Sequence, residues 1–161
     1  MKKNFLSFLS TVFIITILCT TIAACGNTGD KSNEPKNTQG LEFFLQEDGT
    51  YEVGGGGDGI HKAGTACNLS SIAIPSVFGS VSVVKIKNYA FGNFKKLTRI
   101  SIPASIRHIG KGAFINCENL TEIKYNGTLA EWENVEKEED WCKNVSPDCV
   151  VKCSDGNVVV N

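Results

Sequence analysis

Cysteine and histidine are the side chains of this sequence that could do chemistry, because a thiolate is a nucleophile and both residue types bind transition metals. The 161 residues include seven cysteines and two histidines, His61 and His108. A Cys-His hydrolase would place a thiol beside an imidazole, and Cys67 is close to His61 in the sequence. Nothing supplies an oxyanion hole or a third group to orient the imidazole. We therefore predict no enzyme and no catalytic residues, and retain the hydrolase as an alternative.

No metal and no cofactor are expected either. Cys149 and Cys153 are four positions apart, but structural zinc sites usually combine two close pairs of ligands, and no second close pair accompanies them. The segment GGGGDG at 54–59 formally matches Gly-x-Gly-x-x-Gly. A dinucleotide site would also need a helix directly after it, and residues 60–71 show no helical period. We interpret the segment as a flexible loop.

The N-terminal segment gives one cysteine a different role. Two lysines precede an uncharged, mostly apolar run over 5–24, which ends in Ile22-Ala23-Ala24 directly before Cys25. This pattern resembles a bacterial lipoprotein signal peptide, and the resemblance implies cleavage before Cys25 and a diacylglycerol on its thiol. Two acyl chains suffice for stable anchoring. The alternative is an uncleaved transmembrane anchor, since the run approaches the length of about 20 residues that spans a bilayer, although its small-residue end is typical of a cleavage site.

The cysteines beyond this segment are five in number, so at least one thiol has no intramolecular partner. An internal alignment places Cys117 opposite Phe94, which indicates that this position needs a buried apolar group and that Cys117 is the free thiol. The other four, Cys67, Cys142, Cys149 and Cys153, could form up to two disulfides outside the cytoplasm. The sequence leaves their pairing open.

The net charge of the chain after cleavage and the composition of residues 26–40 limit the possible partners and the position of the domain. Removal of residues 1–24 takes away two lysines and no acid, which leaves 14 basic and 17 acidic side chains and a net charge of −3. Such a chain gains little from contacts with phosphates, so we predict no nucleic-acid partner. Residues 26–40 contain no large apolar residue. As a flexible coil they would hold the following domain roughly 20 Å from the anchor.

Two segments in the middle of the chain repeat each other and must position any functional surface. Ile86–Ile102 and Ile109–Tyr125 share their apolar residues at a constant offset of 23 positions. Part of the pattern occurs earlier at an offset of 28, from Leu69 to Pro75, with five surplus residues between Pro75 and Ile86. A fixed period of this size indicates a solenoid.

Within each repeat the alternation of side chains predicts a strand. Ile100 and Ile102 should face the core, while Arg99 and Ser101 point outward. Segments 69–74, 97–102 and 120–125 should lie side by side as parallel strands, with Arg99 beside Glu122 and Ser101 beside Lys124. The outward positions form a candidate binding face: Ser71, Ala73, Arg99, Ser101, Glu122 and Lys124.

Both ends of the repeat are predicted to differ from its middle. Residues 41–53 read as a β-hairpin around Asp48-Gly49. The repeat is predicted to end at Tyr125. A helix should begin at Thr128, where Thr and Glu131 fit a capping box, with Trp132 on its apolar face and the acids of 131–140 on its exposed face. The segment 141–160 should contain a closing strand pair.

These residues together resemble the BspA-like class of bacterial leucine-rich repeats, whose Leu-Thr-x-Ile-x-Ile-Pro strand, Ile-Gly and Ala-Phe elements recur between Leu97 and Leu120. The resemblance implies a short, β-rich leucine-rich-repeat solenoid with short helical turns. It divides the chain into a signal peptide (1–24), a lipidated cysteine with a flexible tether (25–40), an N-terminal hairpin cap (41–68), leucine-rich repeats (69–127) and a C-terminal helical and β cap (128–161).

The same resemblance implies a function. Members of the class are associated with surface-exposed proteins that bind other proteins or adhere to cells. We expect a lipid-anchored, extracytoplasmic surface protein that binds a protein or glycan on a host or neighbouring cell. The alternative is a structural repeat domain without a ligand of its own.

Overall fold

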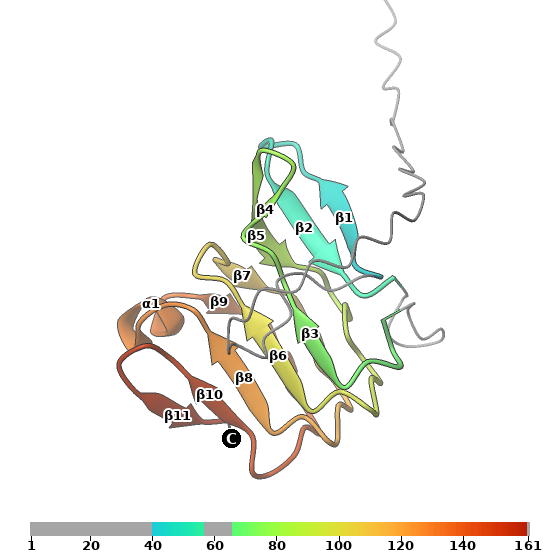
Figure 1. Cartoon of the computed structure of the whole chain (residues 1–161), viewed down its shortest axis with the longest axis vertical. Coiled ribbons are helices and arrows are strands. Elements are labelled where there is room, and N and C mark those ends of the chain that lie inside the picture. Colours follow the sequence, from blue (N-terminus) through green and yellow to red (C-terminus); the bar gives the residue numbers. More distant parts are fainter. Residues whose placement is uncertain (1–39, 57–65, 161) are drawn as a thin grey trace, which may run out of the picture. The chain divides into compact units, whose positions relative to one another are not determined.

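The computed structural model describes residues 40–56 and 66–160, which belong to one compact unit spanning residues 33–161. The predicted signal peptide, Cys25, the predicted tether up to residue 39, and residues 57–65 with His61 lie outside the described residues. The unit contains two β-sheets (Figure 1). Buried side chains from both sheets form a single hydrophobic cluster, so the core lies between them.

The repeated strands form the sheet that we call sheet B. It contains β3 (Ser71–Ala73), β6 (Arg99–Ile102), β8 (Glu122–Tyr125), β10 (Val150–Lys152) and β11 (Asn157–Val159). The first four are parallel, and Ile72, Ile100, Ile123 and Val151 lie opposite one another across the sheet. Figure 1 shows them as neighbours. The predicted parallel arrangement of the three repeated strands is confirmed, and β10 extends it.

The return segments form the other sheet, sheet A. Its order is β1 (Glu42–Leu45), β2 (Tyr51–Gly54), β5 (Val81–Ile86), β7 (His108–Ile109) and β9 (Glu136–Lys137), with β4 (Val77–Phe78) paired to β5. β1 and β2 form the predicted antiparallel hairpin. Gly49 in its turn has a φ of 80°, a conformation that glycine adopts without steric cost. β2 then pairs with β5 in parallel, so the hairpin continues sheet A.

The repeat does not end at Tyr125, which corrects the prediction. β9 pairs with β7, and β10 pairs with β8, in the same parallel arrangement as the earlier turns of the solenoid, which we call coils. The step from Ile123 to Val151 is 28 residues, like the step from Leu69 to Leu97. Compared with the 23-residue step, this step has five extra residues, and the helix α1 (Leu129–Glu133) of 5 residues lies in it. In the earlier 28-residue step, the extra residues lie in the β4–β5 hairpin.

Helix α1 begins as predicted but is shorter. Both hydrogen bonds of the capping box between Thr128 and Glu131 are present, and Trp132 is buried. The helix ends at Glu133, so the acidic residues after it are not on a helical face, contrary to the prediction. Glu136 belongs to β9, and its carboxylate lies 3.2 Å from Nδ1 of His108. The extended pairing of β9 with β7 explains why the helix stops.

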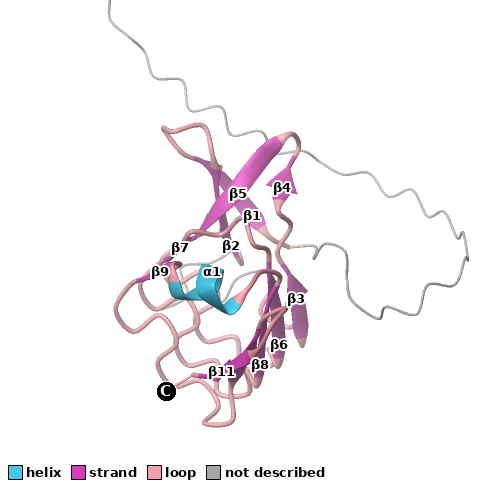
Figure 2. Cartoon of the chain, turned by 90° about the vertical axis from the view of Figure 1, so that its left-hand side faces the viewer, coloured by secondary structure: helices cyan, strands magenta, loops and turns pink. Residues whose placement is uncertain are grey.

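Aromatic side chains pack in the core between the two sheets, which Figure 2 shows on opposite sides of the unit. Phe91 and Phe114, which occupy equivalent positions, stack with centroids 5.5 Å apart, and Phe114 meets Trp141 of the next coil edge to face. Residues 111–116 form turns. Cys117 is fully buried, as the comparison with Phe94 predicted.

Candidate functional site

The exposed side of sheet B carries two rows of outward-pointing residues, which we call the outer face. Strand register places Ser71, Arg99, Glu122 and Val150 in the first row. Ala73, Ser101, Lys124 and Lys152 form the second row. The alternate positions of these strands are buried in the core. The structure therefore brings all six predicted residues together on one side of one sheet.

The predicted residues are not equally accessible. Ala73 is only 5% exposed, so it offers almost no surface to a partner, and Ser71 is half-buried. Arg99 is more open, with half of its side-chain surface exposed. The accessible part of the outer face therefore centres on β6, β8 and β10 rather than on β3.

Glu122 is the centre of the charges on this face. The predicted pairing with Arg99 is confirmed, since Arg99 Nε lies 2.9 Å from Glu122 Oε1. Lys152 Nζ lies 2.6 Å from the other carboxylate oxygen. The hydrogen bond from Lys152, followed by the charges of Arg99 and of Lys124, lowers the pKa of Glu122 from its ordinary value despite partial burial. Glu122 is therefore ionised at neutral pH.

The sequence reasoning missed Lys152 because it ended the repeat too early. A signal was present, since Lys152 follows Lys124 by 28 positions, the same step that separates Leu69 from Leu97. The structure confirms that the two lysines lie directly opposite each other on β8 and β10. Lys152 must accordingly be included in the outer face.

A shallow pocket lies where β8 and β10 end, and we call it the β8–β10 pocket. Its volume is about 490 Å³, and it is lined by Glu122, Lys124, Tyr125, Asn126, Lys152, Cys153 and Ser154. Its walls are held by backbone hydrogen bonds from Asn126 to Ile102 and from Ser154 to Gly127. The pocket is therefore a fixed feature of the sheet end, with two ammonium groups among its lining residues.

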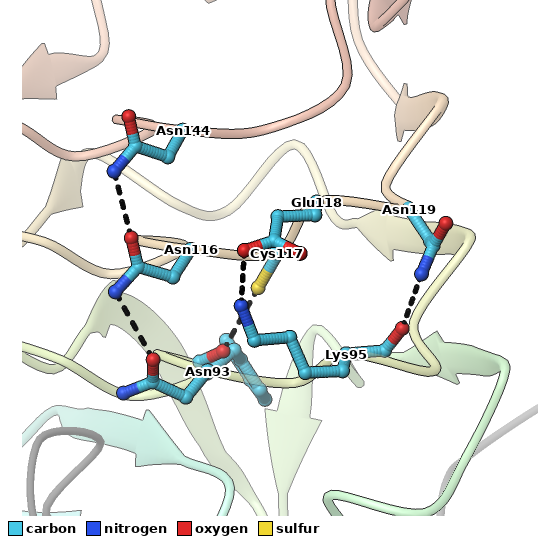
Figure 3. Close-up of polar contacts among 8 residues, drawn as sticks. Asn93, Lys95, Asn116, Cys117, Glu118, Asn119 and Asn144 are labelled. Carbon is cyan, nitrogen blue, oxygen red and sulfur yellow. Dashed lines mark hydrogen bonds and ion pairs between the residues drawn. The ribbon is translucent and has the colours of Figure 1, made fainter.

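A ladder of asparagines joins three successive coils at the turns that precede β6, β8 and β10. Asn116 donates to Oδ1 of Asn93 at 3.0 Å and accepts from Nδ2 of Asn144 at 2.8 Å (Figure 3). All three have φ near 60°, a left-handed conformation that asparagine tolerates better than most residues. The spacing of 23 and then 28 residues matches the strand register, so the ladder supports the same alignment that builds the outer face.

The free thiols of the described residues include three that burial keeps protonated. Cys67, Cys117, Cys142, Cys149 and Cys153 are all unpaired. Burial raises the pKa of Cys117 to about 12 and those of Cys142 and Cys149 to about 11. Their thiols are therefore protonated at neutral pH, whereas a nucleophile needs the thiolate.

The imidazole of His108 lies beside two carboxylates. Its Nδ1 lies 3.2 Å from Glu136 and its Nε2 lies 3.0 Å from Glu138, so both ring nitrogens face carboxylates of the neighbouring strand and the residues after it. Within residues 40–56 and 66–160, no group of three or more His, Cys, Asp or Glu side chains could hold a metal ion. The described part of the chain also contains no helix long and apolar enough to cross a membrane.

Comparisons with known proteins show a similarity of the repeats to one family model. Residues 62–136 match the family model described as "BspA type Leucine rich repeat region (6 copies)". A comparison with curated proteins found no match.

Three solved structures of bacterial repeat proteins are similar. A leucine-rich cell surface protein from Faecalibacterium prausnitzii A2-165 is 28% identical, with a TM-score of 0.44 over 58% of this chain and 24% of that one. The T. pallidum leucine-rich repeat protein is 18% identical (TM-score 0.45, 74% of this chain, 65% of that one). A leucine-rich repeat protein from Bacteroides ovatus ATCC 8483 is 23% identical (TM-score 0.44, 72% and 36%). The chain thus matches less than two thirds of the length of each.

Proposed function

We propose that this chain, whose residues 62–136 match the BspA-type leucine-rich repeat model, is a lipid-anchored protein of the bacterial surface that binds another protein through the outer face of sheet B. The proposal rests on one observation: the outer face presents charged side chains on strands whose opposite side is fixed by a buried core. A rigid strand scaffold holds binding residues more accurately than a loop does.

The charges on the outer face favour recognition over mere stabilisation. An exposed ion pair such as that of Arg99 and Glu122 contributes only about 0.2–1 kcal/mol to stability. Its residues can therefore serve a partner with little cost to the fold. Charged residues at an interface chiefly set specificity and the rate of association.

The proposed anchor is Cys25, which follows the lipobox-like Ile22-Ala23-Ala24. Two acyl chains on Cys25 would hold the chain to a membrane, and the 15 residues of 26–40 would separate the repeat domain from that surface. The repeat domain would then be held at a distance from the lipid surface.

Partner capture tests the binding proposal. The purified protein, immobilised on beads, is exposed to extracts of host surfaces and neighbouring cells, and retained protein and glycan are identified. Arg99→Ala should abolish retention at a cost in stability of no more than about 1 kcal/mol. Lys95→Ala is the matched control, because the Lys95 side chain is equally exposed and also forms an ion pair, with Glu118, outside the outer face. Absence of any retained partner above a scrambled-sequence control would favour a structural repeat domain without a ligand.

Processing of the chain tests the anchor. Cys25→Ser should leave an uncut precursor and shift the protein out of the fraction that depends on acylation, measured by mass spectrometry and metabolic labelling with palmitate. Cys19→Ser is the matched control, because it makes the same change of side chain within the segment 1–24 and leaves Cys25 in place. Normal maturation and labelling of Cys25→Ser would contradict the anchor while leaving the binding proposal intact.

A further inference from the structure

Two lysines face each other in the β8–β10 pocket. Lys124 and Lys152 are direct partners in the parallel register, on strands about 4.8 Å apart. Like charges directly opposite on neighbouring strands destabilise a sheet. Glu122 offsets part of this repulsion by pairing with Lys152, and an anion from outside the chain would offset more of it.

The charges on the accessible strands also favour binding of an anion. Outward positions of β6, β8 and β10 carry three cations, Arg99, Lys124 and Lys152, and one carboxylate, Glu122. The chain as a whole has a formal net charge of −1, so this local excess of positive charge runs against the overall composition. Such a patch attracts negatively charged partners.

The pocket is large enough to admit an incoming side chain. Its volume of about 490 Å³ lies within the usual range for ligand sites, roughly 300–1,000 Å³. Asn126 and Ser154 stand beside the two lysines in its lining and can donate hydrogen bonds to an oxyanion. The Asn126 amide already donates to Ser101 Oγ at 3.3 Å, which holds it toward the outer face.

We infer that the β8–β10 pocket binds the carboxylates of an acidic polypeptide segment, held by Lys124 and Lys152. This inference rests on the proposed function and names the chemistry of its partner. A polypeptide is favoured over an acidic glycan because the one aromatic residue of the pocket, Tyr125, is 1% exposed. Its ring therefore offers no surface on which a sugar could stack.

Glu122 acts in this site as an internal competitor. It occupies Lys152 at 2.6 Å, as the carboxylate of a partner would. An incoming carboxylate must share Lys152 with Glu122, which keeps the affinity for a single acidic group low. A segment with several acidic residues can also interact with Lys124 and with Arg99, which is likewise shared with Glu122, so the site favours runs of acids over isolated ones.

Fluorescence anisotropy with a labelled hexaglutamate peptide tests the inference on the purified full-length chain in detergent micelles. Hexaglutamine is the neutral control peptide. We expect hexaglutamate to bind at least tenfold more tightly than hexaglutamine at low ionic strength, and added salt to weaken its binding. Equal binding of the two peptides would overturn the inference.

Three substitutions make the test specific to the pocket. Lys124→Gln and Lys152→Gln should each weaken hexaglutamate binding about fivefold or more, whereas Glu122→Gln should tighten it because the competing carboxylate is gone. Lys95→Gln removes a lysine of similar exposure outside the pocket and should change binding less than about twofold. Circular dichroism confirms that each variant is folded. Unchanged binding in Lys152→Gln, or weaker binding in Glu122→Gln, would refute the assignment.

Competition separates the two sources of carboxylates. Oligogalacturonate that displaces the peptide at lower concentration than unlabelled hexaglutamate would overturn the polypeptide assignment in favour of an acidic glycan. The assay needs no natural partner, so it is independent of the capture experiment. If hexaglutamate binds but no partner is captured, the result supports the pocket as a binding site and counts against the proposed function. If a captured partner still binds Lys124→Gln and Lys152→Gln, the result counts against the pocket alone.

Discussion

Substitution of Asn116 by alanine is the most informative test of how the coils are held in register. The Asn116 amide is the middle member of the ladder: it donates to Asn93 at 3.0 Å and accepts from Asn144 at 2.8 Å (Figure 3). Its backbone has a φ of 58°. The substitution therefore removes two hydrogen bonds and places a residue with a β-carbon and no compensating polar group in a left-handed conformation.

The expected loss follows from these contacts. Each hydrogen bond contributes about 0.5–1.5 kcal/mol net, and alanine in the left-handed region costs about 1–2 kcal/mol. The free energy of unfolding should fall by about 2–5 kcal/mol. Asn144→Ala is the matched control, because Asn144 has the same φ of 58° and donates one ladder bond. It should cost about one hydrogen bond less, a difference of about 0.5–1.5 kcal/mol.

Equilibrium unfolding in urea measures both losses. Trp132 is 5% exposed and packs against Trp141 of the last coil, so their fluorescence should report unfolding of that end of the repeat. Hydrogen exchange at the amides of Asn93 and Asn116, which donate to the carbonyls of the next coil, gives an independent local measure. If Asn116→Ala costs no more than Asn144→Ala, the ladder bonds do not stabilise the stack and the reasoning is wrong.

Three further predictions concern other parts of the chain. Glu122→Gln should lower the free energy of unfolding by about 0.2–1 kcal/mol at neutral pH. Because the folded state lowers the pKa of Glu122, the difference from wild type should vanish as the pH falls from the ordinary value of 4.5 through the folded pKa. A difference that persists in acid would contradict the charge pairing. Cys117 should resist iodoacetamide in the native state and react after unfolding, since burial raises its pKa to about 12; mass spectrometry would show the opposite if its thiol were accessible. Thr128→Ala removes the N-cap of α1 and should cost about 1 kcal/mol in urea unfolding, whereas Thr128→Ser should restore most of it.

The sequence predicted sheet B well because its period of 23 residues fixes the strand register. Once Ile100 is aligned with Ile123, a parallel sheet places Arg99 beside Glu122 and Ser101 beside Lys124, as the structure confirms. Alternation of side chains then assigns the inward and outward positions. Register and burial are both local consequences of the repeat, which is why they could be predicted from it.

The sequence predicted the end of the repeat poorly because the last coil keeps the geometry while changing the residue types. Lys137 occupies the position of Ile109 in the pairing of β7 with β9, and Trp141 contacts Phe114 from the following turn. The helix inserted at Leu129–Glu133 further shifts the spacing. Identity at the ladder asparagines was the remaining clue, since Asn116 and Asn144 are 28 positions apart.

The coil that the sequence concealed is also the coil that completes the outer face. Lys152 reaches Glu122 and lies opposite Lys124 because β10 pairs with β8. Strand β10 is held there by the Asn144 end of the ladder and by the packing of Trp141 against Phe114 and Trp132. A substitution that loosens this coil should therefore move Lys152 and weaken binding of an acidic segment without touching the pocket. Binding and the stability of the last coil are linked through the position of one strand, so loss of binding identifies a pocket residue only when the unfolding free energy is unchanged.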